Sequence, residues 1–270
     1  MYEADVLEAD DNDVYFMDII NDKIVMNDNY HGILVYDENF QLIKKIELFH
    51  DFIVDFALKG KDGILLFCYD EHVLVYFMIE SLQCKMFSLK KFSDWIFSSL
   101  YVWDDEFVLL SDYNGNIIRL DLKNEKLAVE TGEGRLKRFE KVYQNLRGLQ
   151  VCKNLGAKKS AFISEKNGMI ELIKYTQGSE NGFWVLYDLK EEQFHDFDFE
   201  RHYISAVGEE ETHIIDMNKG QVQKCFADVG WFMIRGNFMV KNEEVFYFLL
   251  EGNKSEQLKM KIRKLGISFS

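Results

Sequence analysis

The sequence predicts an all-β fold in which a unit of four short strands is repeated along the chain. Apolar and aromatic runs of about four to eight residues, such as Gly63–Cys68 and Phe107–Leu110, are bounded by Asp, Asn, Gly or Lys. This is the pattern of short strands separated by turns. A second observation is that a polar turn, an apolar strand, another polar turn and another strand recur in this order in six places.

The six copies are regularly spaced, at a mean interval of about 42 residues. The strand that follows the first turn of each copy is expected near Ile33, Val73, Ile117, Met169, His213 and Val245. A period of about 40–45 residues with four strands per unit is typical of a β-propeller. We therefore predict a six-bladed β-propeller of four-stranded antiparallel blades, which occupies residues 1–270 as a single domain. Unrelated hairpins in a large sandwich or barrel are the alternative.

Four strands can be placed in individual copies. In the first copy they are expected at 13–20, 23–28, 32–37 and 40–48. In the third copy they are expected at 98–103, 106–111, 116–121 and 126–131. In the fifth copy they are expected at 194–200, 202–207, 212–216 and 221–226.

The N-terminal segment Tyr2–Ala9 is also strand-like, and it precedes the first complete copy. An open ring of blades would leave strand edges unpaired. We therefore expect this segment to pair with the last blade, beside strands from 244–268.

One segment has helical rather than strand periodicity. Apolar residues at 136, 139, 142, 143 and 146 share one helix face, and Gly148 follows as a stop signal. This predicts a helical insertion at 135–147. Eight basic residues lie between Arg135 and Lys159. They are interpreted either as the solvated face of this helix or as a docking element for an acidic partner.

The chain is acidic, with 46 Asp and Glu against 32 Lys and Arg and a formal net charge of −14. This balance opposes binding to nucleic acid and to anionic membranes, and it favours a basic protein partner. Solubility alone is the simpler interpretation. The N-terminus is acidic where a signal peptide is basic, and no run approaches the about 20 apolar residues of a membrane span. These features predict a cytoplasmic location.

No catalytic motif stands out. The chain lacks G-x-S-x-G, G-x-x-x-x-G-K and H-E-x-x-H, so we assign no catalytic residue, no metal ligand and no cofactor. Asp196, Asp198 and Glu200 alternate along one predicted strand and place three carboxylates on one face. A Ca²⁺ site draws oxygens from several directions. We therefore interpret this strand as solvated or as facing a central channel.

The run Ser111–Lys126 resembles the central hairpin of generic β-propeller blades. The resemblance is to the WD-repeat architecture without its signature. The pair Trp103-Asp104 is the only Trp-Asp pair, and it precedes a second strand instead of closing a third. No particular family is indicated.

Two functions follow from these observations. The first is a non-catalytic, monomeric protein-binding module, in its most specific form a cytosolic inhibitor or immunity-type protein that masks a basic partner such as a nuclease. Candidate partner-binding residues combine carboxylates with aromatic anchors. They are Asp94, Trp95, Trp103, Asp104, Asp105, Asp196, Asp198 and Trp231. The alternative is a propeller hydrolase or lyase that uses carboxylates in the central channel.

Overall fold

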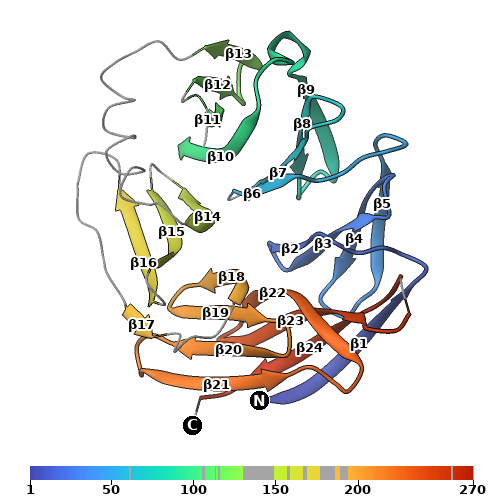
Figure 1. The fold of residues 1–270 in the computed structure, drawn as a ribbon, viewed down its shortest axis with the longest axis vertical. Helices are drawn as coiled ribbons and strands as arrows, with labels where there is room; N and C mark the ends of the chain where they lie inside the picture. Colours follow the sequence, from blue (N-terminus) through green and yellow to red (C-terminus); the bar gives the residue numbers. More distant parts are fainter. Residues whose placement is uncertain are drawn as a thin grey trace. The chain divides into compact units, whose positions relative to one another are not determined.

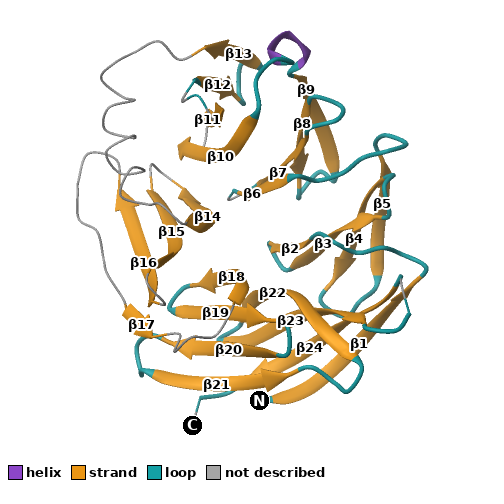
Figure 2. Ribbon diagram, viewed as in Figure 1, coloured by secondary structure: helices purple, strands orange, loops and turns teal. Residues whose placement is uncertain are grey.

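The structure, a computed structural model, describes residues 1–60, 62–104, 107–112, 114, 116–129, 149–156, 159–166, 169–176, 186–188, 194–256 and 258–269. For residues 10, 56, 98–104, 107, 109 and 111 and for the strands between 149 and 188 it describes the backbone alone. Every regular element in these ranges is a strand except one turn of 3-10 helix, η1 (Lys90–Phe92) (Figure 2). The prediction of an all-β fold is confirmed.

The chain divides into two compact units. The first unit combines Met1–Phe52 with Glu191–Ser270, and the second is Ile53–Lys190. The single domain over 1–270 stays a prediction.

The first unit contains three four-stranded antiparallel sheets, each a blade in which consecutive strands pair (Figure 1). One blade is β2 (Met17–Ile20), β3 (Lys23–Asp28), β4 (Gly32–Asp37) and β5 (Leu42–Glu47). Another is β18 (Phe194–Glu200), β19 (Tyr203–Gly208), β20 (Glu211–Asp216) and β21 (Gln221–Phe226). The third is β22 (Trp231–Lys241), β23 (Glu244–Asn253), β24 (Lys259–Ile267) and β1 (Tyr2–Asp10).

The second unit contains one four-stranded blade and one eight-stranded sheet. The blade is β10 (Phe97–Asp104), β11 (Phe107–Asp112), β12 (Ile117–Asp121) and β13 (Lys126–Val129). One half of the eight-stranded sheet is β6 (Phe56–Lys59), β7 (Gly63–Cys68), β8 (Val73–Met78) and β9 (Gln83–Ser88). The other half is β14 (Leu149–Gly156), β15 (Lys159–Lys166), β16 (Met169–Thr176) and β17 (Leu186–Asp188).

The prediction of six separate four-stranded blades is wrong in its count. The described residues form four separate four-stranded blades, and the remaining two antiparallel meanders share one sheet. They are joined where the edge strands β6 and β14 pair in parallel at Lys59 and Lys153. A single bridge between free strand edges is enough for this fusion, and no sequence pattern marks it.

The N-terminal strand pairs with the C-terminal strand, as predicted. β1 runs antiparallel to β24, from Tyr2 opposite Gly266 to Asp10 opposite Lys259. The last blade is therefore built from both ends of the chain, and β1 covers the edge that β24 would otherwise expose.

The strand positions agree closely with the predictions in the first, third and fifth copies. The last copy differs. Val245 lies at the start of β23, which is the second strand of its sheet, whereas the strand expected there was a third strand. The third strand is β24, so the short interval of 32 residues from His213 to Val245 reflects a shift by one strand.

The cores lie between neighbouring sheets of the same unit. β7 is buried along its whole length, because apolar side chains cover both of its faces. In the second unit Phe67 of β7 contacts Phe97 of β10, with ring centroids 5.5 Å apart. In the first unit Tyr247 and Leu249 of β23 pack with Val207 of β19. The fourth strand β5 is largely exposed. This stacking of sheets fixes the strand ends from which the loops project.

The predicted helix at 135–147 lies outside the described residues, so it stays a prediction. In the described part of the chain, no helix is long and apolar enough to cross a membrane.

Candidate partner-binding site

Asp94 and Trp95 lie in the second unit, in the segment between η1 and β10. The Asp94 side chain is exposed. The Trp95 ring is half-buried and lies 5.2 Å from the Phe92 ring and 6.2 Å from the Phe97 ring, centroid to centroid. Trp95 therefore packs on the core of the second unit, and Asp94 is the more exposed member of this pair.

The candidate segment 103–105 is described only in part. Trp103 and Asp104 belong to β10, whose backbone pairs Asp104 with Phe107 of β11. Their side chains and the whole of Asp105 lie outside the described residues. These three residues remain candidates, and their side-chain positions stay untested.

Asp196 and Asp198 lie together in the first unit, where the edge strands β18 and β22 meet. The Asp196 carboxylate accepts a hydrogen bond from the backbone N–H of Gly236 at 3.0 Å. The Asp198 carboxylate accepts one from the backbone N–H of Phe238 at 2.7 Å. Asp196 and Asp198 are two residues apart on β18, and they accept hydrogen bonds from backbone N–H groups that are two residues apart on the edge strand β22. This contact joins two blades, which is a structural role.

The same junction contains charge that is largely removed from water. Nε of Arg235 lies 3.5 Å from Oδ1 of Asp196. Burial raises the pKa of Asp196 to about 6, although Arg235 and the Gly236 N–H both favour the ionised form. Asp198 is only 3% exposed. A partner therefore cannot reach Asp198 without opening the contact between β18 and β22.

Trp231 opens β22, and its environment combines aromatic and charged groups. Nζ of Lys261 lies 4.3 Å from the centroid of the Trp231 ring. The same ammonium group donates a hydrogen bond to Asp228, which lowers the pKa of the Asp228 carboxyl. The Trp231 side chain is half-buried. It is therefore a partly accessible aromatic side chain held by a cation on β24.

A buried ion pair lies next to Lys261 and Asp228. Arg263 donates from Nε to Oε2 of Glu251 at 2.7 Å and from a terminal nitrogen to Oε1 at 2.9 Å. The Glu251 side chain is fully buried, and burial raises its pKa against the opposing effect of Arg263. Another Arg263 bond, of 2.8 Å, goes to the carbonyl of Phe226. The arginine thereby links β24 to the end of β21 in the neighbouring blade.

Sequence reasoning missed Lys261, Arg263 and Glu251. The available signal was the alternation of Lys259, Lys261 and Arg263 along one predicted strand, which places three basic side chains on one face. Lys259 lies 3.8 Å from Glu256, three residues before it, whereas Lys261 and Arg263 meet Glu251 on the neighbouring strand β23 and Asp228 in the loop before β22. The choice of these partners depends on strand register, so the sequence alone could not pair them.

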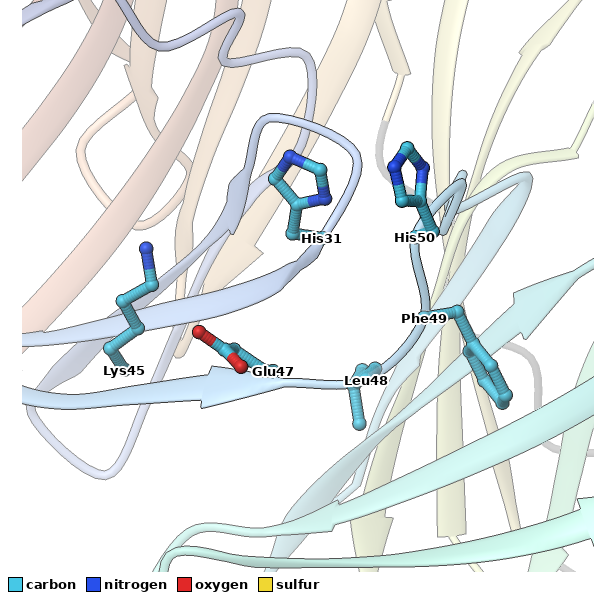
Figure 3. Close-up of a pocket in the computed structure, with 6 residues that line it drawn as sticks. All are labelled: His31, Lys45, Glu47, Leu48, Phe49 and His50. Carbon is cyan, nitrogen blue, oxygen red and sulfur yellow. The ribbon is translucent and has the colours of Figure 1, made fainter.

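A separate open pocket of about 420 Å³ lies at the end of the blade formed by β2 to β5. It is lined by His31, Lys45, Glu47, Leu48, Phe49 and His50. Figure 3 shows the two imidazole rings turned toward one another, with the Phe49 ring pointing away from them. Their centroids are 5.4 Å apart, edge to face. Nζ of Lys45 forms an ion pair with Oδ2 of Asp28 at 2.7 Å. In the described part of the chain, no cluster of three or more His, Cys, Asp or Glu side chains has the arrangement of a metal site.

The candidate residues thus form two separate sets, one in each unit. Asp94, Trp95 and the 103–105 segment belong to the second unit, whereas Asp196, Asp198 and Trp231 belong to the first. Within the first unit, Trp231 lies with charged residues at a loop, and the two aspartates lie between strands.

No family model matches this sequence, and no curated protein matches it either. Solved structures do match over nearly the whole chain. The WD40 domain of Pan2 from Neurospora crassa has a TM-score of 0.58 at 8% identity and covers 98% of this chain and 96% of that chain. The β-propeller domain of Cps50 (Swd1) from Myceliophteria thermophila has a TM-score of 0.56 at 8% identity, covering 98% and 99%. The WD40 repeats of RRP9 have a TM-score of 0.50 at 7% identity, covering 96% and 97%.

At this level of identity the likeness concerns the fold alone. Four-stranded antiparallel blades in both units and the match to WD40 domains lead to the same conclusion. The chain has the fold of a WD40-like β-propeller and lacks the WD signature in its sequence.

Proposed function

We propose that this chain is a non-catalytic protein-binding propeller whose partner presents a basic surface. Rigid blades that carry loops at the ends of their strands suit recognition of another protein, because the scaffold holds the loops in place. Many small contacts can then form without a large cost of ordering the binding surface.

The observation that carries the proposal is the charge that remains after internal pairing. In the first unit Lys45, Lys254 and Arg263 lie 2.7, 3.0 and 2.7 Å from carboxylates of the same chain. Acidic residues outnumber basic ones by 14, so pairing every basic side chain would still leave 14 carboxylates without a basic partner. An acidic field of this size accelerates association with a basic protein.

The most specific form of the proposal is an inhibitor or immunity-type protein that masks a basic protein such as a nuclease. Masking requires fast association and slow dissociation. Charge complementarity makes association fast, and desolvated aromatic or apolar contacts make dissociation slow. In this proposal the chain acts as a monomer in the cytoplasm and does not bind nucleic acid.

The contact residues that we propose are the exposed Asp94, the partly accessible Trp231 and the candidates of the 103–105 segment. The last three are Trp103, Asp104 and Asp105. Trp95, Asp196 and Asp198 act as supports, because the described contacts of these side chains lie within their own unit.

The hydrolase or lyase alternative requires carboxylates that face a substrate. Asp196 and Asp198 lie on the strand that the sequence predicts to be solvated or to face a central channel, and each accepts a hydrogen bond from the backbone of β22. That arrangement favours a role in joining the blades over a role in acid–base chemistry.

The test is capture of the tagged protein from its own cells, followed by reconstitution of the complex from purified components. We expect a partner with a basic surface that forms a complex of defined stoichiometry on size-exclusion chromatography. A reconstituted partner whose contact surface is acidic or uncharged would contradict the proposal.

A further inference from the structure

The loop from Phe226 to Trp231, which connects β21 to β22, has a fixed backbone. Ala227 donates its N–H to the carbonyl of Glu210 at 2.9 Å, and Trp231 donates to Asp228 at 3.0 Å. Lys254 donates to the carbonyl of Gly230 at 2.8 Å. Gly230 has a φ of +86°, which a residue with a side chain rarely adopts. The 226–231 loop is therefore held by both neighbouring hairpins.

This fixed loop displays apolar side chains to solvent. Val229 is fully exposed and Phe226 is 59% exposed. Val229 lies two residues and Phe226 five residues before the half-buried Trp231. Exposed apolar side chains on an ordered loop mark a contact surface when they occur together, whereas single ones are ordinary.

Carboxylates surround these apolar groups. The side chains of Glu209, Glu210 and Asp228 are 71%, 77% and 54% exposed. Lys254 is 39% exposed, and its Nζ lies 3.0 Å from Glu210 and 3.9 Å from Glu209, so one cation faces two of these three carboxylates. The Lys261 and Arg263 side chains are only 10% and 9% exposed and are engaged by carboxylates. The surface around the loop is therefore acidic.

A pocket adjoins the loop. It has a volume of about 530 Å³ and is lined by His195, Glu209, Phe232, Met233, Ile234 and Lys254. The backbone N–H of Met233 donates to the Glu209 carbonyl at 2.8 Å, which ties the pocket to the Glu209–Glu210 turn. The Glu209 carboxylate can pair with the charged end of a Lys or Arg side chain, and the apolar lining residues can pack against its methylene groups.

We propose that the 226–231 loop and the adjoining Glu209 pocket form the docking site for a basic segment of a protein partner. An apolar side chain of that segment packs on Phe226 and Val229, and a Lys or Arg side chain enters the pocket toward Glu209. A second copy of this acidic chain would bring like charges together, so the occupant is a basic protein. This inference rests on the proposed function and assigns it to named residues.

The test uses short synthetic peptides of defined composition. One peptide alternates Arg with Leu, and a second of equal charge alternates Arg with Ser. Fluorescence anisotropy gives the affinity of each for the full-length protein at low and high salt. We expect the Arg–Leu peptide to bind about tenfold more tightly than the Arg–Ser peptide, and both to weaken as salt rises.

Two sets of variants, each with a control, locate the binding. V229D and Phe226→Ser should remove the preference for the Arg–Leu peptide, whereas Leu42→Ser should keep it. Leu42 is the control because it is 55% exposed on β5, in another blade of the same unit. Glu210→Lys should weaken both peptides several-fold. Asp51→Lys, the same charge change at a side chain that is 84% exposed, should weaken them less. Thermal melts confirm that every variant is folded.

Equal affinity of the wild-type protein for the two peptides would overturn the docking site, as would a preference that survives V229D and Phe226→Ser. Absence of binding would overturn it too. None of these results decides the proposed function, because the complex reconstituted with the captured partner tests that function separately.

Discussion

The Asp198 carboxylate and the backbone N–H of Phe238 form a 2.7 Å hydrogen bond between β18 and β22, the facing edge strands of two blades. Together with Asp196 and Gly236 this makes two parallel side-chain-to-backbone bonds. An edge strand that would otherwise present free N–H groups is therefore capped by the carboxylates of its neighbour. The acidic strand at 194–200 is thus explained by blade packing.

Replacing Asp198 with Ala should destabilise the protein by about 1–3 kcal/mol, because the buried N–H of Phe238 loses its acceptor. Asp198→Asn should cost less, since its amide oxygen can accept the same bond. Urea unfolding measures both. The exposed Asp94→Ala is the control and should change stability by less than about 0.5 kcal/mol. Equal stability of Asp198→Ala and the wild type would contradict the capping role.

Asp196 should give the protein a characteristic pH dependence. Its pKa is raised to about 6 in the folded protein, above the about 3.9 of an unfolded chain. Between these values the folded state binds more protons, so this group's contribution to stability is present below about pH 4 and is lost as the pH rises through about 6. We expect this loss to be absent in Asp196→Asn.

The measurement is urea unfolding of the wild type and Asp196→Asn at several pH values between 4 and 7. Other carboxylates titrate equally in both proteins, so the difference between them isolates Asp196. A difference that does not change with pH would show that the carboxyl has an ordinary pKa.

Deleting residues 1–9 should lower the melting temperature by about 5–10 °C. β1 covers the edge of β24 over almost its whole length, so the deletion removes a strand of the last blade. Differential scanning calorimetry measures the effect. A melting temperature equal to that of the full chain would mean that this pairing contributes nothing to stability.

Arg263→Ala should destabilise the protein by about 3–5 kcal/mol, because it removes both hydrogen bonds that Arg263 donates to the fully buried Glu251 carboxylate and leaves it only Lys261, at 3.5 Å. The double variant Glu251→Met with Arg263→Met should recover most of this loss, since it removes both charges. Chemical unfolding of the three variants and the wild type tests the pair. A double variant as unstable as Arg263→Ala would indicate that Arg263 acts mainly through Phe226 and the neighbouring blade.

The strands could be predicted because local chemistry determines them. Asn21 and Asp22, with φ of +46° and +58°, form the two-residue turn between β2 and β3, and such residues adopt this conformation readily. Apolar runs between turns of this kind locate the strands within a few residues. The repeat then locates the four-stranded units, and the edge of β24 that would otherwise be unpaired explains the pairing with β1.

The interactions between blades could not be predicted. The partner of Asp198 lies 40 residues away in sequence, and that of Arg263 on β21 lies 37 residues away. The fusion of two sheets depends on one backbone bridge between Lys59 and Lys153, which is independent of side-chain pattern. The exposure of Phe226 and Val229 is likewise a property of the folded loop, since apolar residues in a sequence are normally assigned to the core.

We propose that acidic charge guides a basic protein partner onto this propeller. The most direct test is the association rate constant of the reconstituted complex, measured by stopped-flow fluorescence from low to high salt. Exposed charges are screened over about 8 Å at physiological ionic strength, so the rate constant should fall by about tenfold or more while the dissociation rate constant changes less. The double variant Asp104→Lys with Asp105→Lys should slow association further. An association rate constant that is independent of salt and of this reversal would contradict the claim.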